Sequence, residues 1–386
     1  MIKLFISKQF NRIARFFLSL QAKVLLKHGK DHVFFEHIMD PSWNYKPYRH
    51  RMNPYFAQYG FKYNMVEFEY YKLLTGVESN LYIPHTFFYY YLVPYLNCSA
   101  RYHQDKNMFR RLLGYDNRKT DYIMPHQIVY NMSGSFYTSE NEICGKNEAV
   151  RLILSYKGDI IVKPTTHTSK GKNIVKLRRE DITESQVNKL ISSYKTDFSF
   201  EECMIQHPAL ATFNKSSLNT MRVVTYRKPS GEIKYLHSLL RFGGDGSVVD
   251  NASAGGGMVA ITENGEILRK TVHLRSVQTS WLDNCVTNTI PHFERIKQTA
   301  LYLHAKLPYL NLIGWDMSIT PEGTPVLIEF NTRPSPYGWQ TIYGPLFSRE
   351  EMDEIMPEIA KWKLSYECCP MISFPDKKGH RGHISF

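Results

Sequence analysis

Two carboxylates and an amide lie near the end of the chain, inside two apolar stretches. Asp316 interrupts LIGWDMSI, and Glu329 and Asn331 belong to VLIEFN. A four-residue turn, Pro-Glu-Gly-Thr, would pair Thr320 with Pro325, which places Asp316 opposite Glu329 and Asn331 on the same face. Buried carboxylates repel each other without a cation, and Mg²⁺ prefers such oxygen ligands. The alternative is an exposed hairpin whose carboxylates face solvent.

A second predicted hairpin carries the opposite charge. Its turn, Pro-Ser-Gly-Glu, pairs Arg222 with Leu239, so Arg241 becomes the diagonal neighbour of Arg222 on the same face. Guanidinium groups placed together attract a shared anion, and their fork matches phosphate or carboxylate oxygens. Two arginines on a solvated face that binds no ligand are the alternative.

A third predicted hairpin contains groups that can bind phosphate. DIIVKP and NIVKL predict two strands, and Lys163 at the end of the first would place its ammonium beside the polar loop TTHTSKGK, residues 165–172. Ser169, Lys170 and Gly171 in this loop offer a hydroxyl, a cation and free backbone, although the loop lacks the Walker A pattern. An ordinary surface loop is the alternative.

Two more segments contain candidate groups. FSFEECMIQ predicts an edge strand that leaves a domain, and its Glu201 and Glu202 can hydrogen-bond a nucleotide sugar or base; a solvated acid pair is the alternative. NASAGGGM, which begins at Asn251, has three successive glycines. Its backbone can approach a ligand closely and offer N–H donors to an oxyanion, or it can serve only as a flexible connector.

In chain order, these segments resemble a known superfamily. Lys163, the polar loop, the acidic pair, Arg222 and the D-x12-E-x-N spacing from Asp316 to Asn331 resemble ATP-grasp enzymes, which include D-alanine:D-alanine ligase. More narrowly, QHP, SLNTMRVVTY, LLRFGGDGSVVDNASAGGGM and EFNTRPSPYGWQ resemble the sugar-transfer-associated ATP-grasp family of polysaccharide biosynthesis. The similarity covers roughly residues 106–347, and the ordered set is more specific than any one motif.

The resemblance implies ATP held between two α+β lobes, and it implies roles for individual residues. The implied cofactor-binding residues are Lys163, Ser169, Lys170, Gly171, Glu201, Glu202 and Met204; the metal ligands for Mg²⁺ are Asp316, Glu329 and Asn331; the catalytic residues are Arg222, Arg241 and Asn251. The serine- and glycine-rich phosphate lid of the best-known ligases has no clear counterpart. Their earlier nucleotide-binding lysine is not assigned, with Lys106 and Lys157 as candidates.

Composition and element pattern predict a globular α+β protein. Its 386 residues are 43% hydrophobic, enough for a core in two or three lobes, and hairpins mix with helices. We expect an accessory region at 1–100 with an amphipathic helix and many aromatics, ATP-grasp lobes at 101–205 and 206–350, and a C-terminal helix and tail at 351–386. Six scattered cysteines favour a reducing cytoplasm over a disulfide framework.

The net charge of +12 favours anionic partners. Apolar residues at helical spacing alternate with lysine and arginine over residues 1–30, so this helix either packs on its own domain or lies on the inner face of an anionic membrane. We predict neither a transmembrane helix nor a signal peptide, and we expect FFYYYLVPYL to be buried core. The chain shows no motif that reads nucleic acid.

Three functions are compatible with these patterns. The first is a carboxylate–amine ligase that acts through an acyl phosphate, joining, by family analogy, an amino acid or amino alcohol to a uronic acid of a surface polysaccharide. The second is an ATP-grasp kinase that phosphorylates a sugar hydroxyl. The third is a non-catalytic glycan- or membrane-binding partner of a synthase, which would tolerate loss of the metal ligands.

Overall fold

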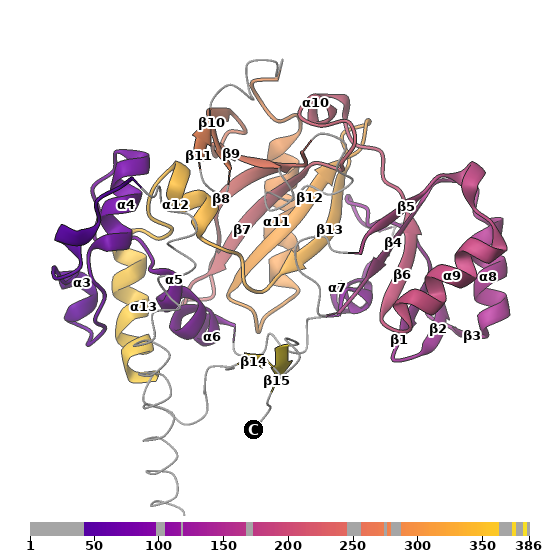
Figure 1. Ribbon diagram of the computed structural model, residues 1–386, viewed down its shortest axis with the longest axis horizontal. Helices are drawn as coiled ribbons and strands as arrows, with labels where there is room; N and C mark the ends of the chain where they lie inside the picture. The colour runs from indigo at the N-terminus through magenta and orange to yellow at the C-terminus, as the bar shows by residue number, and fades with distance from the viewer. Residues whose placement is uncertain are drawn as a thin grey trace, which may run out of the picture. The chain divides into compact units, whose positions relative to one another are not determined.

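The computed structural model describes residues 42–97, 105–116, 119–166, 173–244, 256–273, 276–278, 287–362, 373–375 and 381–383. The chain forms two compact units, residues 96–344 and residues 1–95 with 345–386. Among the described residues, strands form a six-stranded and a seven-stranded sheet in the first unit and a two-stranded sheet in the second (Figure 1). Helices and antiparallel sheets are thus combined, as the α+β prediction required.

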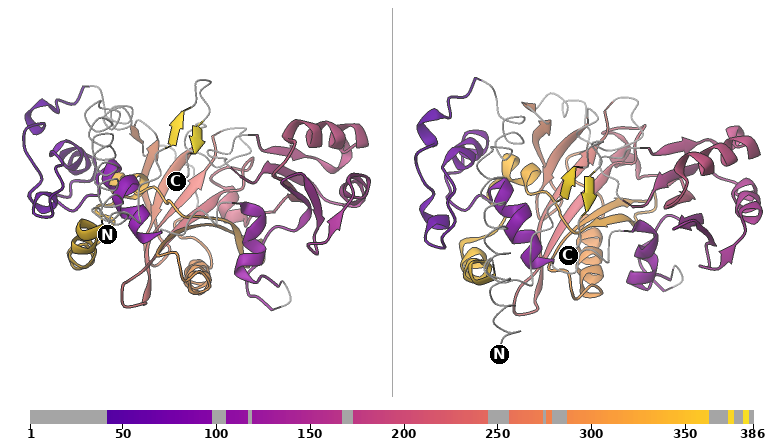
Figure 2. Two further views of the ribbon diagram at one scale, coloured as in Figure 1. Left: turned by 90° about the horizontal axis from the view of Figure 1, so that it is seen from below. Right: turned by 60° about the horizontal axis from the view of Figure 1, so that its bottom comes forward.

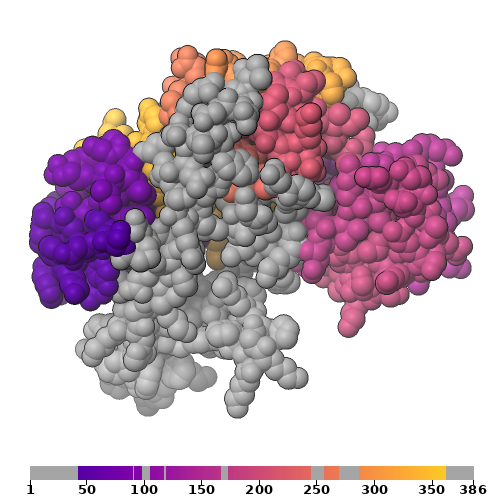
Figure 3. Space-filling view, turned by 45° about the horizontal axis from the view of Figure 1, so that its top comes forward, coloured from indigo at the N-terminus to yellow at the C-terminus, as the bar shows by residue number. Residues whose placement is uncertain are grey.

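The six-stranded sheet has the order β3-β2-β1-β6-β4-β5, and every neighbouring pair is antiparallel. Its strands are β1 (Gln127–Met132), β2 (Ser135–Thr138), β3 (Ile143–Cys144), β4 (Ile160–Pro164), β5 (Val175–Leu177) and β6 (Phe198–Glu202). Helices α8 (Lys146–Ser155) and α9 (Glu184–Tyr194) cover one face, where Val150, Val187 and Phe200 are buried together (Figure 2). The space-filling view shows this sheet and its helices as one closely packed body (Figure 3).

Strand β6 corrects one sequence-based expectation. It lies between β1 and β4 and is therefore a central strand, not an edge strand. Phe198 and Phe200 pack into the helix-covered core, while Ser199 and Glu201 are buried on the opposite face. Side chains on both faces of β6 are therefore buried. The alternation of apolar and polar residues is the same for a central strand and for an edge strand, so the sequence could not distinguish the two positions.

The seven-stranded sheet has the order β11-β10-β9-β8-β7-β12-β13. Its strands are β7 (Thr220–Arg227), β8 (Ile233–Phe242), β9 (Gly257–Ile261), β10 (Ile267–His273), β11 (Ser276–Gln278), β12 (Leu312–Ile319) and β13 (Pro325–Asn331). Helix α11 (Phe293–Ala305) packs on one face against Val223, Leu240 and Trp315. Because side chains alternate along a strand, the residues between these core positions point to the opposite face.

Both predicted hairpins of this sheet form, and a β-bulge in each decides the register. At the turns, Ile319 pairs with Pro325 and Arg227 with Ile233, one residue away from the expected pairing. An irregularity between Asp316 and Met317, and another between Val224 and Thr225, restores the predicted register farther along each strand. A bulge adds one unpaired residue to one strand and so shifts the pairing beyond it by one. The pairs at the candidate site are therefore the expected ones.

Short helices complete the first unit. They are the 3-10 turn η4 (Lys106–Met108), α7 (Phe109–Leu113), η5 (Arg179–Asp181), α10 (Pro208–Ala211) and α12 (Tyr337–Ile342). Helix α7 ends at Gly114, whose φ of +57° is a left-handed C-cap. Its Phe109 is buried in the core of the seven-stranded sheet.

The other unit is built around aromatic side chains. Its elements are η1 (Lys46–Tyr48), α3 (Pro54–Ala57), α4 (Val66–Thr75), α5 (His85–Phe87), the π-helical η2 (Phe88–Leu92), α6 (Val93–Leu96), α13 (Arg349–Trp362), β14 (Ser373–Pro375) and β15 (Arg381–His383). Phe56, Phe61 and Phe87 are buried and meet edge to face. The FFYYYLVPYL segment is thus core, as predicted, and no described helix is both long and apolar enough to cross a bilayer. The amphipathic helix expected at 1–30 lies outside the described residues.

Candidate active site

The three predicted metal ligands meet on the sheet face opposite α11. Asp316 pairs directly with Glu329 across β12 and β13, and Asn331 follows two residues later on the same face. The Asn331 amide donates hydrogen bonds to Asp316 Oδ2 at 3.2 Å and to Glu329 Oε1 at 3.4 Å. Asp316 is only 3% exposed, so the alternative of a solvated hairpin does not apply.

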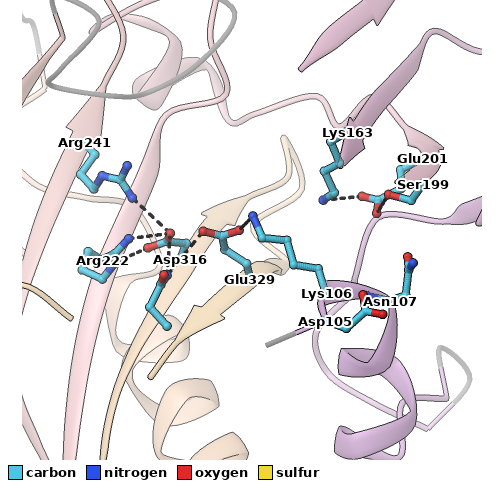
Figure 4. Close-up of polar contacts among 11 residues, drawn as sticks. Asp105, Lys106, Asn107, Lys163, Ser199, Glu201, Arg222, Arg241, Asp316 and Glu329 are labelled. Atoms are coloured by element: carbon cyan, nitrogen blue, oxygen red, sulfur yellow. Dashed lines mark hydrogen bonds and ion pairs between the residues drawn. The ribbon is translucent and has the colours of Figure 1, made fainter. Parts of the chain in front are cut away.

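Both predicted arginines point at Asp316. Arg222 pairs with Asp316 across β7 and β12, and its guanidinium group donates hydrogen bonds to both carboxylate oxygens, with Nη2 2.8 Å from Oδ2. Arg241, from β8, donates to the same Oδ2 at 3.1 Å (Figure 4). The anion that the two guanidinium groups share in this structure is thus a carboxylate of the site. Such charge-assisted, bidentate contacts fix the orientation of both partners.

Gly314 makes room for this arrangement. It lies two residues before Asp316 on the same face of β12. A Cβ atom at this position would come within 2.9 Å of Arg222 Cδ and 2.8 Å of Pro334 Cβ. Glycine therefore allows the Arg222 stem to lie directly on the strand, under the segment that follows β13.

Glu329 has a cation of its own, Lys106. The ammonium comes from the η4 turn and forms an ion pair with Glu329 Oε2 (Figure 4). Burial by itself would lower the pKa of Lys106, but the Glu329 carboxylate, with Asp316 and Glu201 farther away, outweighs it and raises that pKa. Burial likewise opposes ionisation of Glu329, yet the lysine holds the pKa of the carboxyl well below its usual range. Both groups therefore stay charged at neutral pH.

Lys106 is one of the two lysines between which the sequence left the earlier nucleotide-binding position open. The other candidate, Lys157, lines a different pocket beside His126 and Tyr156. Only the tertiary contact with Glu329 separates the two lysines.

The six-stranded sheet contributes a second charged pair. Lys163 on β4 lies opposite Ser199 on β6, and its Nζ is 2.6 Å from Glu201 Oε2. The Ser199 hydroxyl donates to the other carboxylate oxygen at 2.7 Å. Glu202, one residue on, accepts instead from the backbone N–H of His126 at 3.2 Å. Adjacent strand residues point to opposite faces, so only Glu201 shares the face of Lys163.

The linker between the two sheets is anchored by Gln206. Its amide donates to the carbonyls of Asn214 and Ser217 and accepts from the backbone N–H of Asn219. This network explains why QHP and SLNT stand out in the sequence. Half-buried Met204 lies in the same linker, directly after β6. The remaining predicted residues Ser169, Lys170, Gly171 and Asn251 lie outside the described residues.

The donor set fits Mg²⁺. Two carboxylates and an amide side chain converge, and Mg²⁺ is bound in proteins by one or two carboxylates, with phosphate and water completing its octahedron. Within the described ranges, no cluster of three or more His, Cys, Asp or Glu side chains offers another metal site. Lys106, Lys163, Arg222 and Arg241 surround this point with positive charge.

Comparisons with known proteins identify the family. The family model described as sugar-transfer associated ATP-grasp matches residues 97–352. No curated protein matches the sequence. Solved structures with a similar fold include the D-alanine-D-alanine ligase from Coxiella burnetii (10% identity, TM-score 0.39, 67% of this chain and 58% of that one). Another is the ATP-grasp ligase PsnB with its minimal precursor, Mg and ADP (15%, TM-score 0.39, 69% and 62%).

A third is N5-carboxyaminoimidazole ribonucleotide synthetase in an ADP complex (16%, TM-score 0.35, 60% and 45%). The chain thus spans about half to three-fifths of the length of these structures. The family model, by contrast, covers both sheets and the whole candidate site. The protein therefore belongs to the sugar-transfer associated ATP-grasp family.

Proposed function

We propose that the protein is an ATP-dependent carboxylate–amine ligase that forms an amide bond. A carboxylate oxygen of the acid attacks the γ-phosphorus of ATP, the bond to the β-γ bridging oxygen breaks, and ADP leaves. The amine then attacks the acyl carbon, the acyl–oxygen bond breaks, and inorganic phosphate departs while the amine loses a proton. One observation carries this proposal: Asp316, Glu329 and Asn331 converge on one sheet face, paired with cations from the neighbouring strands β7 and β8 and from the η4 turn.

Asp316, Glu329 and Asn331 would hold Mg²⁺ in this scheme. The ion would neutralise phosphate charge and orient the transferred group. Lys106 and Lys163 each lie on a carboxylate of the site and can shift to phosphate oxygens as point charges. Positioning and charge stabilisation supply the catalysis, so that a nucleophilic side chain is unnecessary.

Arg222 and Arg241 would stabilise the negative charge that develops on the acyl phosphate and tetrahedral intermediate. Asp316 fixes both guanidinium groups before the reaction, so they do not need to reorganise during it. We assign Asn251 to the same step from sequence alone, since it begins the glycine-rich segment.

The nucleotide base and ribose would lie beside the linker after β6. Glu201 shares the face of Lys163, and the backbone near Met204 follows directly, whereas Glu202 would reach the nucleotide from the strand end. Ser169, Lys170 and Gly171 would cover the phosphates from the loop between β4 and β5.

By family analogy, the acid is a uronic acid of a surface polysaccharide and the amine an amino acid or amino alcohol. This function fits a cytoplasmic enzyme, with the basic residues 1–30 as a peripheral contact to the inner membrane face.

Phosphate release from Mg-ATP tests the proposal. We would supply uronic acids with and without amino acids or amino alcohols, and compare the unaltered chain with Glu329→Gln and with Glu322→Gln as a matched control. Glu322 is exposed in the turn of the same hairpin. Release that needs both acid and amine, is lost in Glu329→Gln and is kept in Glu322→Gln supports the ligase. Phosphate that stays on a sugar product would establish a kinase instead, and failure to bind Mg-ATP would exclude both.

A further inference from the structure

The turn that carries Lys106 is too short to hold its own position. Element η4 spans only Lys106–Met108, and its N-cap Asp105 accepts a hydrogen bond from the Asn107 backbone at 2.9 Å. A single 3-10 turn makes few internal hydrogen bonds. The place of Lys106 therefore depends on what the turn contacts in the two sheets.

Asn107 fastens the turn to the six-stranded sheet. Its side-chain amide donates to the carbonyl of Asn131 at 3.1 Å and to Thr165 Oγ1 at 3.1 Å, and its oxygen accepts from Gln127 Nε2 at 3.1 Å. The residue is only 1% exposed. Both amide hydrogens and the oxygen are thus satisfied at a buried position, where a lost partner is costly. Thr165 adds a backbone contact, because its carbonyl accepts from the N–H of Lys106 at 3.2 Å.

The other side of the segment touches the seven-stranded sheet. The Phe109 ring stacks on Phe330 with 4.1 Å between centroids, and Lys106 pairs with Glu329, the neighbour of Phe330 on β13. The segment from Asp105 to Phe109 therefore spans from β1 and β4 to β13. Within it, Asn107 supplies the side-chain anchor to β1 and to the end of β4. The ammonium of the neighbouring residue, Lys106, reaches Glu329 (Figure 4).

We propose that Asn107 is a positioning residue that sets nucleotide affinity through Lys106. This inference rests on the proposed ATP site and adds to it a residue that touches neither nucleotide nor metal. A lysine side chain has several rotatable bonds, so its ammonium is well placed only if its backbone is fixed. Asn107 fixes that backbone in advance. Without Asn107, the turn would have to become ordered when the nucleotide binds, and the entropy lost in that ordering would weaken binding.

A merely structural role predicts a different pattern from a positioning role. If Asn107 only stabilises the lobe, its removal weakens nucleotide binding by the same factor whether or not Lys106 is present. If Asn107 acts through Lys106, its removal has no effect once the ammonium is gone. A double-mutant cycle separates the two, because coupling appears as non-additivity.

The experiment measures the dissociation constant of Mg-ADP by calorimetry for Asn107→Ala, Lys106→Met and the double variant. We expect each single variant to bind about tenfold more weakly, the size expected when a buried or charged hydrogen-bond partner is lost. The double variant should bind as Lys106→Met does. Asn188→Ala, in α9, where the Asn188 amide donates to the Glu184 carbonyl of its own helix, should leave the constant unchanged.

Two results would overturn the inference: an Asn107→Ala constant equal to that of the unaltered chain, or a double variant about a hundredfold weaker, the additive outcome. Should Asn107→Ala fail to fold, Thr165→Val and Gln127→Met each remove one partner of the amide at nearly constant volume, and the same cycle applies to them. Failure of the unaltered chain to bind Mg-ADP would instead overturn the ATP site itself, and the inference with it.

Discussion

Replacing Asp316 by asparagine is expected to destabilise the fold as well as abolish turnover. The substitution keeps the size of the side chain but removes the charge that holds two guanidinium groups. The side chains of Arg222 and Arg241 are 18% and 17% exposed and that of Asp316 is 4% exposed, so the three charges are largely shielded from water. Removing one partner of such a group leaves the others buried without compensation.

The expected loss is about 3 kcal/mol, the lower end for a broken buried ion pair, because the arginines retain some exposure and an amide oxygen can still accept a hydrogen bond. In a unit of this size that loss lowers Tm by about 6–12 °C. Glu329→Gln is the matched comparison. Glu329 is 21% exposed, against 4% for Asp316, and it has one cationic partner instead of two, so we expect a smaller loss of about 1 kcal/mol.

Denaturant unfolding of both variants, beside phosphate release, provides the assay. We expect both variants to lose turnover by at least about a hundredfold, but only Asp316→Asn to lose substantial stability. Equal stability of Asp316→Asn and the unaltered protein would show that the carboxylate does not hold the arginines. A stability loss in Glu329→Gln as large as that in Asp316→Asn would refute the reasoning from burial.

Three further predictions concern other parts of the molecule. Gly314→Ala should lower turnover about 10- to 100-fold, since its methyl would displace the stem of Arg222; steady-state kinetics would show this, and unchanged kinetics would contradict it. Lys157→Met should leave Mg-ADP affinity unchanged where Lys106→Met lowers it, and equal losses by calorimetry would refute that assignment. Burial lowers the pKa of His304 to about 4, so the folded protein binds fewer protons than the unfolded chain between about pH 6.5 and 4, and stability is lost as the pH is lowered through that range. Denaturant unfolding should show a loss of about 2 kcal/mol from pH 8 to pH 5 that His304→Gln lacks, and identical pH slopes would disprove the link.

The site pairs were predictable from sequence although the turns were not. Counting from four-residue turns gave Asp316 opposite Glu329 and Arg222 opposite Leu239, and the structure has both pairs. In each hairpin the register at the turn differs by one residue, and a bulge compensates. Side-chain alternation reports which residues share a face, but a bulge depends on local strand twist and packing that no pattern of residue types encodes.

Strand β6 and Lys106 mark the limits of this reasoning. The sequence of β6 predicted a strand, yet its central position depends on which strands lie beside it, and that is a property of long-range pairing. Lys106 and Lys157 look alike in sequence. Tertiary contacts bring one of them to Glu329: Asn107 anchors its turn to the six-stranded sheet, and Phe109 packs on the seven-stranded sheet.

By itself, the sequence determined the family, the α+β class and the strand face that Asp316, Glu329 and Asn331 share, because residue type and two-residue periodicity decide what chemistry a strand face can offer. Tertiary structure alone decided which cation each carboxylate meets: Arg222 and Arg241 for Asp316, and Lys106 for Glu329. Charged groups pair according to distance in space. That distance is set by how the two sheets and the turn between them pack, not by separation along the chain.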